Sequence, residues 1–142
     1  MTVQAVANIR DLPRIPAGGP EDATWTPIRH ALGIGAFGIN AWHADTGEVV
    51  IEDHDEIPET DADGEGGHEE LYVVIAGHAQ FGVGDDIIDA PEGTLIALPP
   101  HLRRTAIALA DETTVLAIGA PRGEAFRPSA WERRAITQAN LV

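Results

Sequence analysis

The chain contains no cysteine and no apolar run long enough to cross a membrane. Without cysteine, disulfides, thiolate catalysis and thiolate metal sites are excluded, and any metal ligand must be histidine, carboxylate or backbone oxygen. A membrane-spanning helix needs about 18 consecutive apolar residues, and no segment of these 142 residues approaches that length. The start, MTVQAVANIR, lacks a charged segment followed by an apolar one, so we expect no secretory signal and a cytoplasmic location.

Basic residues and serine are scarce. The chain has 9 Lys and Arg against 23 Asp and Glu, which gives a formal net charge of -14. Such a protein repels phosphate backbones and anionic lipids, so we expect no nucleic-acid partner and no membrane partner. Ser129 is the only serine and no glycine-rich phosphate-binding motif opens a helix, which argues against a serine nucleophile and a nucleotide cradle.

The positions of turn-forming residues divide the chain into an N-terminal arm over 1–22, a β-rich body over 23–122 and a helical segment over 123–142. In the body, short β-type runs alternate with glycine-containing breaks, which predicts a single all-β domain, a closed antiparallel barrel or sandwich. We expect strands near 26–32, 36–43, 47–53, 70–76, 78–83, 87–89, 94–98, 103–109 and 113–119.

The C-terminal helix is predicted over Ala130–Ala139. Ser129 and Glu132 have the S-x-x-E spacing of a capping box, in which each side chain accepts a hydrogen bond from a backbone N–H of the first turn. Trp131 is expected to pack this short helix against the barrel, whereas His43 is expected on an exposed strand face.

Residues 52–70 form a strongly acidic segment, in which ten of nineteen residues are Asp or Glu and which also contains His54 and His68. This charge density requires either solvent or a neutralising cation. We expect residues 57–66 to be a solvated loop between two strands, and any specific chemistry to lie at the two ends of the segment.

Alternation along the two flanking strands groups the ionisable side chains, because residues two apart in a strand share a face. If both faces turn into one barrel, imidazoles and carboxylates form a site suited to Zn, Mn, Fe, Ni or Cu. The alternative is that the histidines only cap strand ends and the barrel holds no metal. The two sets are Glu52, His54 and Glu56 on one strand and His68, Glu70 and Tyr72 on the next.

Two spacings resemble the cupin motifs. Glu70 and Gly77, with six residues between them, resemble the end of the first motif, G-x5-H-x-H-x3,4-E-x6-G. Gly93 and Pro99, with five residues between them, resemble the start of the second, G-x5-P-x-G-x2-H-x3-N. The resemblance covers roughly residues 35–119. It implies a double-stranded β-helix, or jelly-roll, barrel and a homodimer, but it is not specific for any reaction.

The chain departs from these motifs at the metal ligands. The two histidines expected before Glu70 are absent, since residues 63–66 read Asp-Gly-Glu-Gly. In the second motif, His101 takes the glycine position and Arg104 takes the position of the ligand histidine. An arginine cannot lose its proton to bind a metal, so the usual three-histidine, one-glutamate set is not intact.

The residues expected at the site are His54, His68 and Glu70 as metal ligands, with Glu56, Tyr72 and Arg104 acting on the bound molecule. Glu56 would be a further ligand or a base, and Arg104, facing inward, would pair with Glu70 or clamp a ligand carboxylate. Two hypotheses follow. The first is a small metal-dependent enzyme acting on a small organic molecule. The second is a non-catalytic barrel that binds such a molecule without metal; a barrel that serves mainly assembly is a third.

Overall fold

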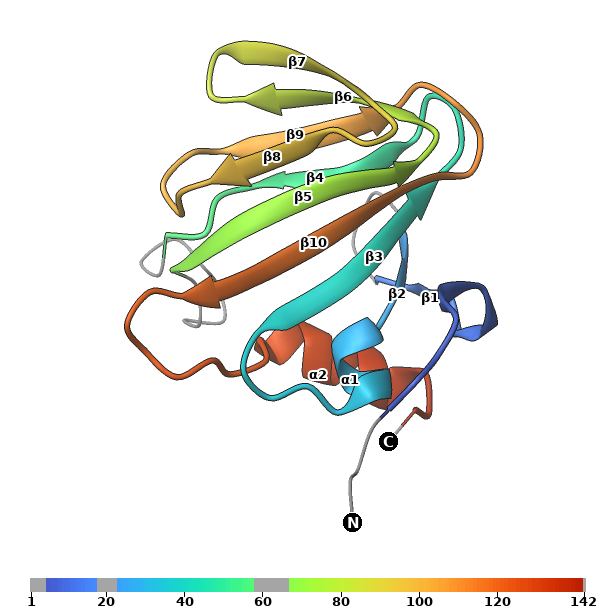
Figure 1. The fold of residues 1–142 in the computed structure, drawn as a ribbon, viewed down its shortest axis with the longest axis vertical. Coiled ribbons are helices and arrows are strands. Elements are labelled where there is room, and N and C mark those ends of the chain that lie inside the picture. Colours follow the sequence, from blue (N-terminus) through green and yellow to red (C-terminus); the bar gives the residue numbers. More distant parts are fainter. Residues whose placement is uncertain (1–4, 18–22, 58–66, 142) are drawn as a thin grey trace.

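Two antiparallel β-sheets face one another in the computed structural model of the protein, which describes residues 5–17, 23–57 and 67–141 (Figure 1). The larger sheet has the strand order β1 (Ile15–Pro16), β2 (Thr24–Thr26), β3 (Gly38–Ala44), β10 (Thr113–Pro121), β5 (His68–Ala76) and β8 (Leu95–Leu98). The smaller sheet has the order β4 (Val49–His54), β9 (Arg104–Ala108), β6 (His78–Val83) and β7 (Asp86–Pro91). The helical elements are the 3₁₀ turn η1 (Ile9–Asp11) and the helices α1 (Ile28–Leu32) and α2 (Ala130–Gln138).

Alternating side chains from the two sheets form the barrel core. In β5, Tyr72 and Val74 point inward and are buried, and they pack with residues of the smaller sheet such as Val50 and Phe81. The continuous apolar run that follows Glu70 therefore has one face in this core. The strands predicted from residue 36 onward correspond to β3 through β10, so the all-β prediction is confirmed for the described residues.

The strand predicted over 26–32 is wrong beyond Thr26, because Ile28–Leu32 forms α1. Pro27 stands at the N-cap, and Gly33 ends the helix in the left-handed conformation with φ 69°. The Gly33 N–H donates to the carbonyls of the last turn. A proline before the first turn and a glycine after the last are typical helix boundaries, which the alternating pattern of this short segment does not reveal.

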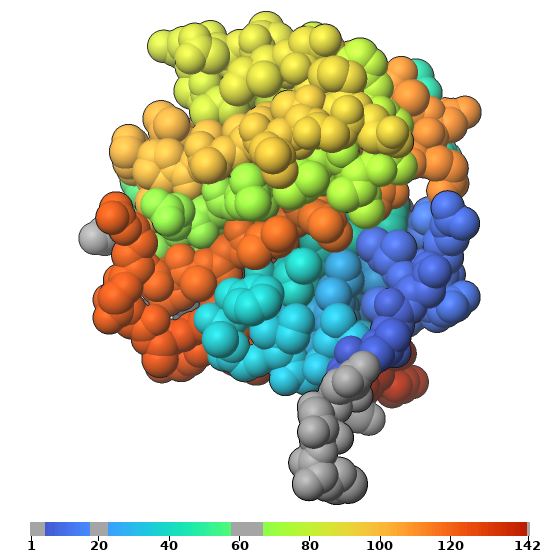
Figure 2. All heavy atoms as spheres, viewed as in Figure 1, coloured from blue at the N-terminus to red at the C-terminus, as the bar shows by residue number. Residues whose placement is uncertain are grey.

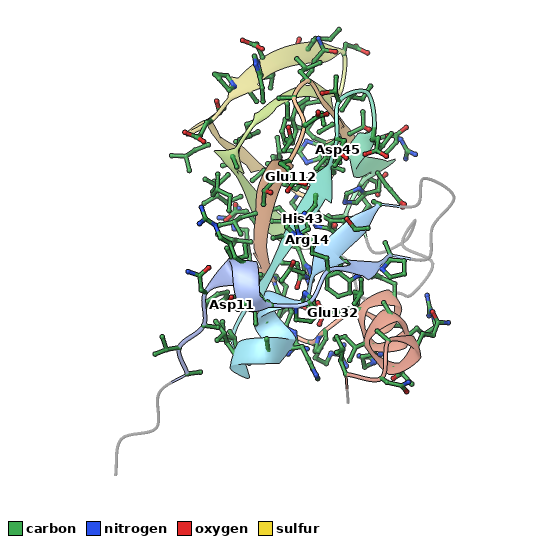
Figure 3. The ribbon with its side chains drawn as sticks, turned by 90° about the vertical axis from the view of Figure 1, so that its right-hand side faces the viewer. Asp11, Arg14, His43, Asp45, Glu112 and Glu132 are labelled. Atoms are coloured by element: carbon green, nitrogen blue, oxygen red, sulfur yellow. The ribbon has the colours of Figure 1, made fainter. Side chains whose placement is uncertain are left out.

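Helix α2 packs on the part of the larger sheet near β2 and β3, where it forms a second core (Figure 3). The prediction that Trp131 packs this helix against the barrel is confirmed, since the centre of its ring lies 5.0 Å from that of Trp25 and 5.6 Å from that of Trp42. Trp25, which is fully buried, also stacks on Trp42 at 5.8 Å. Offset and edge-on aromatic pairs of this kind add about 0.5–1.5 kcal/mol each beyond the apolar area they bury.

The capping box predicted at the start of α2 does not form. Ser129 occupies the N-cap position, but its side chain makes no capping hydrogen bond. Glu132 is only 3% exposed; it accepts hydrogen bonds from Arg29 Nε at 2.7 Å and from the Asn40 amide at 3.1 Å. A buried carboxylate is stabilised more by a guanidinium and an amide than by an exposed backbone N–H, so Glu132 ties α2 to α1 and β3.

The expectation for His43 is also wrong, because this side chain is buried on β3. Its Nε2 lies 2.7 Å from the hydroxyl of Thr26, and its Nδ1 lies 3.2 Å from that of Thr114. Burial, followed by the nearby charge of Arg14, lowers the pKa of His43 to about 4. The imidazole is therefore neutral near pH 7 and links strands β2, β3 and β10.

The outer face of the larger sheet is apolar where β5, β8 and β10 lie side by side, and these strands are at the surface in Figure 2 (green, gold and orange). Val73 pairs with Leu95 and Leu116 across this face, and Leu95 is 65% exposed. The homodimer expected from the cupin resemblance stays a prediction. Within the part of the chain that the structure describes, no helix is long and apolar enough to span a membrane.

Gly77, which closes β5, offers a test of the fold. It has φ +77°, and a Cβ at this position would overlap the buried Thr113. We predict that Gly77→Ala lowers the free energy of unfolding by at least about 2 kcal/mol, measured by urea denaturation. Gly35→Ala is the matched control, since a Cβ there meets open space; it should change stability by less than about 0.5 kcal/mol. Equal effects of the two substitutions would contradict this account of the turn.

Candidate metal centre

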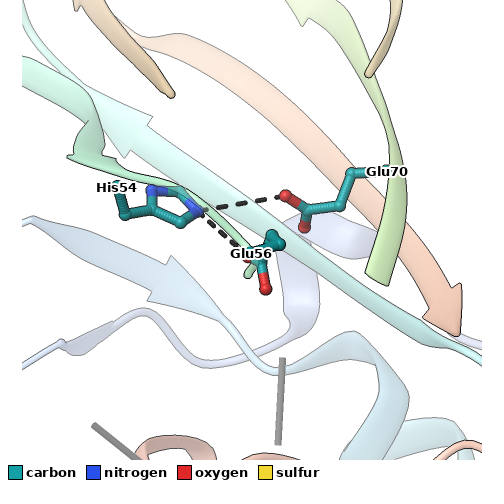
Figure 4. Close-up of side chains that lie close together, drawn as sticks. All are labelled: His54, Glu56 and Glu70. Atoms are coloured by element: carbon teal, nitrogen blue, oxygen red, sulfur yellow. Dashed lines mark hydrogen bonds and ion pairs between the residues drawn. The ribbon is translucent and has the colours of Figure 1, made fainter. Parts of the chain in front are cut away.

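Three ionisable side chains converge between the two sheets: His54 at the end of β4, Glu56 just after it, and Glu70 on β5 (Figure 4). One potential ligand atom from each lies within 4.8 Å of the others. The Nε2 atom of His54 is 3.1 Å from a carboxylate oxygen of Glu56 and 3.9 Å from one of Glu70. Among the described residues, this is the group of His, Asp and Glu side chains with the geometry to share an ion.

The backbone positions the group from several directions. The Glu56 N–H donates to the carbonyl of Pro100 at 2.9 Å, and the Gly67 N–H donates to the carbonyl of Glu56. Glu70 pairs in register with Gly119 of β10, and a Cβ on Gly119 would lie 3.0 Å from Glu70 Cγ. Because glycine has no side chain, position 119 leaves space for the side chain of Glu70.

His54 has a defined tautomer. Its Nδ1 lies 2.6 Å from the backbone carbonyl of Glu52, which can only accept a hydrogen bond, so Nδ1 carries the proton. In the neutral ring, the lone pair of Nε2 then faces the two carboxylates. Burial lowers the pKa of His54, but hydrogen bonds to Glu56 and the Glu52 carbonyl, with the charges of Glu56 and Glu70, outweigh it and raise the pKa above 6.5. The site therefore favours a positive charge at Nε2.

Glu70 is the most perturbed carboxyl of the group. Burial, followed by the negative charge of Glu56, raises its pKa to about 7. The hydroxyl of Tyr72 donates to Glu70 Oε1 at 2.7 Å, and this bond acts in the opposite direction. Burial, and then the charge of Glu70, raises the pKa of Tyr72 well above 10. Tyr72 is thus a hydrogen-bond donor that orients Glu70, and it is not suited to be a base.

Arg104 faces inward, as predicted, but it is fully buried and does not line the neighbouring cavity. Its Nη2 donates to the Pro99 carbonyl at 3.1 Å, and its Nε lies 4.0 Å from Glu70 Oε1. The adjacent Arg103 points outward and pairs with Asp53 at 2.8 Å. Of the two roles expected of Arg104, the pairing with Glu70 is seen in this approach, and the clamping of a ligand stays a prediction. With no exposed surface, its charge acts on Glu70.

His68 lies at the start of β5, with its ring 5.5 Å from that of Phe126. It is not one of the three residues whose ligand atoms lie within 4.8 Å of each other, and Glu56 takes the place that we expected it to fill. Residues 58–66, which include most of the expected solvated loop and the positions of the missing motif histidines, lie outside the described residues.

A cavity of about 500 Å³ is lined by two of the three side chains, His54 and Glu56. It opens between the barrel and α2. The sequence did not predict that the C-terminal helix forms part of the cavity wall. Glu132, which lines the cavity, was interpreted as part of a helix cap. The lining residues with functional groups are Asn40, Glu52, Asp53, His54, Asp55, Glu56, His68, Ser129, Glu132 and Arg134, together with the aromatic Trp42, Tyr72, Phe126 and Trp131.

Solved structures resemble this arrangement of sheets. A cupin protein from Bacteroides fragilis superposes with a TM-score of 0.63 at 16% identity, over 87% of this chain and 89% of that one. The chain has the cupin fold. A sugar phosphate isomerase of the cupin superfamily from Silicibacter pomeroyi matches with a TM-score of 0.65 at 15% identity, over 82% of this chain and 75% of that one. KdgF from a Halomonas species matches with a TM-score of 0.57 at 18% identity, over 74% and 84%.

The sequence itself matches no protein-family model and no curated protein. At identities of 15–18% the structural matches establish the cupin fold and no shared activity. They confirm the jelly-roll barrel that the spacing of Glu70 and Gly77 indicated. The ligand set of this chain, which differs from the cupin motifs, therefore has to be interpreted from its own residues.

The raised pKa of Glu70 predicts how stability depends on pH in metal-free protein. A carboxyl that titrates near 7 when folded and near 4.5 when unfolded costs stability as the pH rises between these values. We predict that Glu70→Gln removes this loss and makes the chelator-treated protein more stable than the parent at pH 8, by on the order of 2 kcal/mol. Urea denaturation at pH 5 and pH 8 measures it.

Glu69→Gln, at the exposed neighbouring position, is the control and should leave the pH dependence unchanged. A Glu70→Gln protein that is less stable than the parent at pH 8 would show that the carboxylate is well stabilised without a metal.

Proposed function

We propose that this cupin binds a divalent transition-metal ion through His54, Glu56 and Glu70, and that the ion acts on a small organic molecule in the adjoining cavity. The observation that carries the proposal is the orientation of His54, whose Nε2 faces two carboxylates while its Nδ1–H is held by a backbone carbonyl. A lone pair directed at two negative groups requires a cation between them, either a proton or a metal.

The donor set fits such an ion. Nitrogen and oxygen ligands bind Zn²⁺ at about 2.0–2.2 Å, so ligand atoms that share an ion lie about 3–4.4 Å apart. The distances of 3.1 and 3.9 Å from Nε2 to the two carboxylates fall in that range. One imidazole with two carboxylates suits Zn, Mn or Fe, and Ni and Cu also bind imidazole.

A bound ion of this kind would supply a Lewis acid or an oxygen-activating centre. The protein's own groups would set its surroundings. The Glu52 carbonyl fixes the tautomer of His54, and Tyr72 orients Glu70. Glu56 lines the cavity, whereas Glu70 is not among its lining residues and is the carboxylate that accepts the hydrogen bond from Tyr72. Glu56 is therefore the carboxylate better placed to exchange a proton with a molecule in the cavity.

A non-catalytic ligand-binding cupin is the second candidate. It is favoured by Arg104, which stands where the second motif has a ligand histidine and leaves a single imidazole in the group. In that case the positive charge between His54 and the carboxylates is a proton. The cytoplasmic location and the homodimer are retained as predictions under both candidates.

Metal analysis separates the two candidates. We predict that protein purified without an affinity tag binds one divalent transition-metal ion per chain, measured by elemental analysis and by calorimetric titration of the chelator-treated protein. His54→Ala and Glu56→Gln should each weaken binding at least about tenfold, because each removes a direct ligand. His68→Ala should have a smaller effect than His54→Ala, since His68 lies outside the group.

His78→Ala is the matched control, because this partly exposed histidine pairs with Asp89 on the smaller sheet and should not affect the metal. The enzyme proposal fails if no stoichiometric metal binds and chelation leaves the thermal stability unchanged.

A further inference from the structure

We propose that the cavity takes a small organic amine in its cationic form, and that it discriminates against phosphate esters. This inference rests on the proposed function only in placing the ligand beside the metal centre. It is derived from two cavity-lining side chains other than the proposed metal ligands, Asn40 and Glu52, each of which has an acceptor atom without a donor, and from the aromatic rings that line the same cavity.

The charges of the wall are mainly negative. Histidines apart, the described lining residues with a positive charge are limited to Arg134, and the chain contains no lysine. The neighbouring Arg29 and Arg103 are engaged in ion pairs of 2.7 and 2.8 Å with Glu132 and Asp53, and Arg104 is buried. A phosphate ester would have to be desolvated among carboxylates without a pair of available cations. The acidic lining residues are Glu52, Asp53, Asp55, Glu56 and Glu132.

Asn40 supplies an acceptor with a defined orientation. Its side chain is only 8% exposed, and its Nδ2 donates to the Glu132 carboxylate at 3.1 Å. Because a carboxylate can only accept, Nδ2 is the atom that faces Glu132, and Oδ1 of this cavity-lining residue is left as an acceptor. This oxygen has no hydrogen-bond partner among the described residues. A buried carbonyl without a donor costs about 1–3 kcal/mol, which a ligand N–H would recover.

Glu52 supplies a second acceptor on the opposite sheet. Its backbone carbonyl holds His54, but its side-chain Oε1 is buried and has no hydrogen-bond partner in the described part of the chain. Glu52 also lines the cavity. An uncompensated buried carboxylate oxygen favours a ligand that brings both N–H groups and positive charge. An ammonium group meets both needs, whereas a hydroxyl brings only a donor and a phosphate brings neither.

Aromatic rings complete the wall. Trp42 and Trp131, with ring centroids 5.6 Å apart, both line the cavity, as does Phe126. Trp42 is fixed from behind by the fully buried Trp25. Indole rings attract cations through their π faces by about 0.5–2 kcal/mol, and their apolar surface suits the hydrocarbon part of an amine. Acceptors, negative charge and indoles together distinguish this cavity from a phosphate site.

A matched series on one ring tests the charge preference: benzylamine, benzyl alcohol and benzyl phosphate. Each is titrated into metal-loaded and chelator-treated protein at 0.15 M salt, a roughly physiological ionic strength, and followed by ligand-observed NMR and tryptophan fluorescence. In the chelator-treated protein we expect saturable one-to-one binding of benzylamine, at least tenfold tighter than benzyl alcohol, and no measurable binding of benzyl phosphate. In that protein, benzyl phosphate or benzyl alcohol binding as tightly as the amine overturns the proposal, and so does the absence of saturable amine binding. Any binding that appears only in the metal-loaded protein is assigned to the ion itself.

Glu52→Gln tests the location, because it removes the charge and keeps the shape of the side chain. It should weaken benzylamine at least fivefold, while Glu69→Gln, which removes an equal charge at an exposed position, should not. Equal effects would mean that the overall charge of -14 attracts the amine, and would overturn the proposal. The metal affinity of the same samples is measured in a separate titration. Loss of metal binding with retained amine selectivity would contradict only the proposed metal centre.

Discussion

The architecture depends on one unfavourable burial, that of the Glu70 carboxylate between two sheets. It is accommodated because Gly119 leaves room beside it, Tyr72 donates to it, and Arg104 lies behind it without any exposure to solvent. His54 approaches from the other sheet with its only free lone pair facing the same carboxylate and that of Glu56. A positive charge between these groups, carried by a proton or by a metal ion, stabilises their arrangement, and this is the basis of the proposed metal centre.

A second structural feature determines what surrounds that site. The larger sheet extends beyond the smaller one, and α2 packs on the extension through three tryptophans. Glu132 joins this helix to Arg29 and Asn40, and the resulting hydrogen bonds orient the Asn40 amide. The C-terminal helix thus contributes to the cavity twice, through the indole of Trp131 and through the acceptor that Glu132 leaves at Asn40.

The many short β-type runs predicted a barrel or sandwich, and the resemblance of two spacings to the cupin motifs implied the jelly-roll barrel. The Glu70–Gly77 interval lies in β5 and the turn that ends it. The β-type runs did not reveal α1, whose boundaries are set by Pro27 and Gly33. The alternating pattern correctly predicted that His54, Glu70 and Arg104 face inward. The pattern defines the face of the strand on which a side chain lies, but it does not define the distance between two side chains. Hence alternation grouped His68 with His54 and Glu70, but the three residues with ligand atoms within 4.8 Å of one another are His54, Glu56 and Glu70. Glu132 was expected to be part of a cap, although its partners are 92 and 103 residues away. Partners so distant in sequence leave no local pattern.

The central claim is that His54, Glu56 and Glu70 hold one metal ion. Anomalous diffraction from crystals of the Mn²⁺-loaded protein tests it most directly. The account predicts a single strong peak per chain, about 2.0–2.3 Å from His54 Nε2 and from one carboxylate oxygen each of Glu56 and Glu70. A peak bound only by other acidic side chains, or an imidazole that remains hydrogen-bonded to Glu56 with no peak beside it, would contradict it.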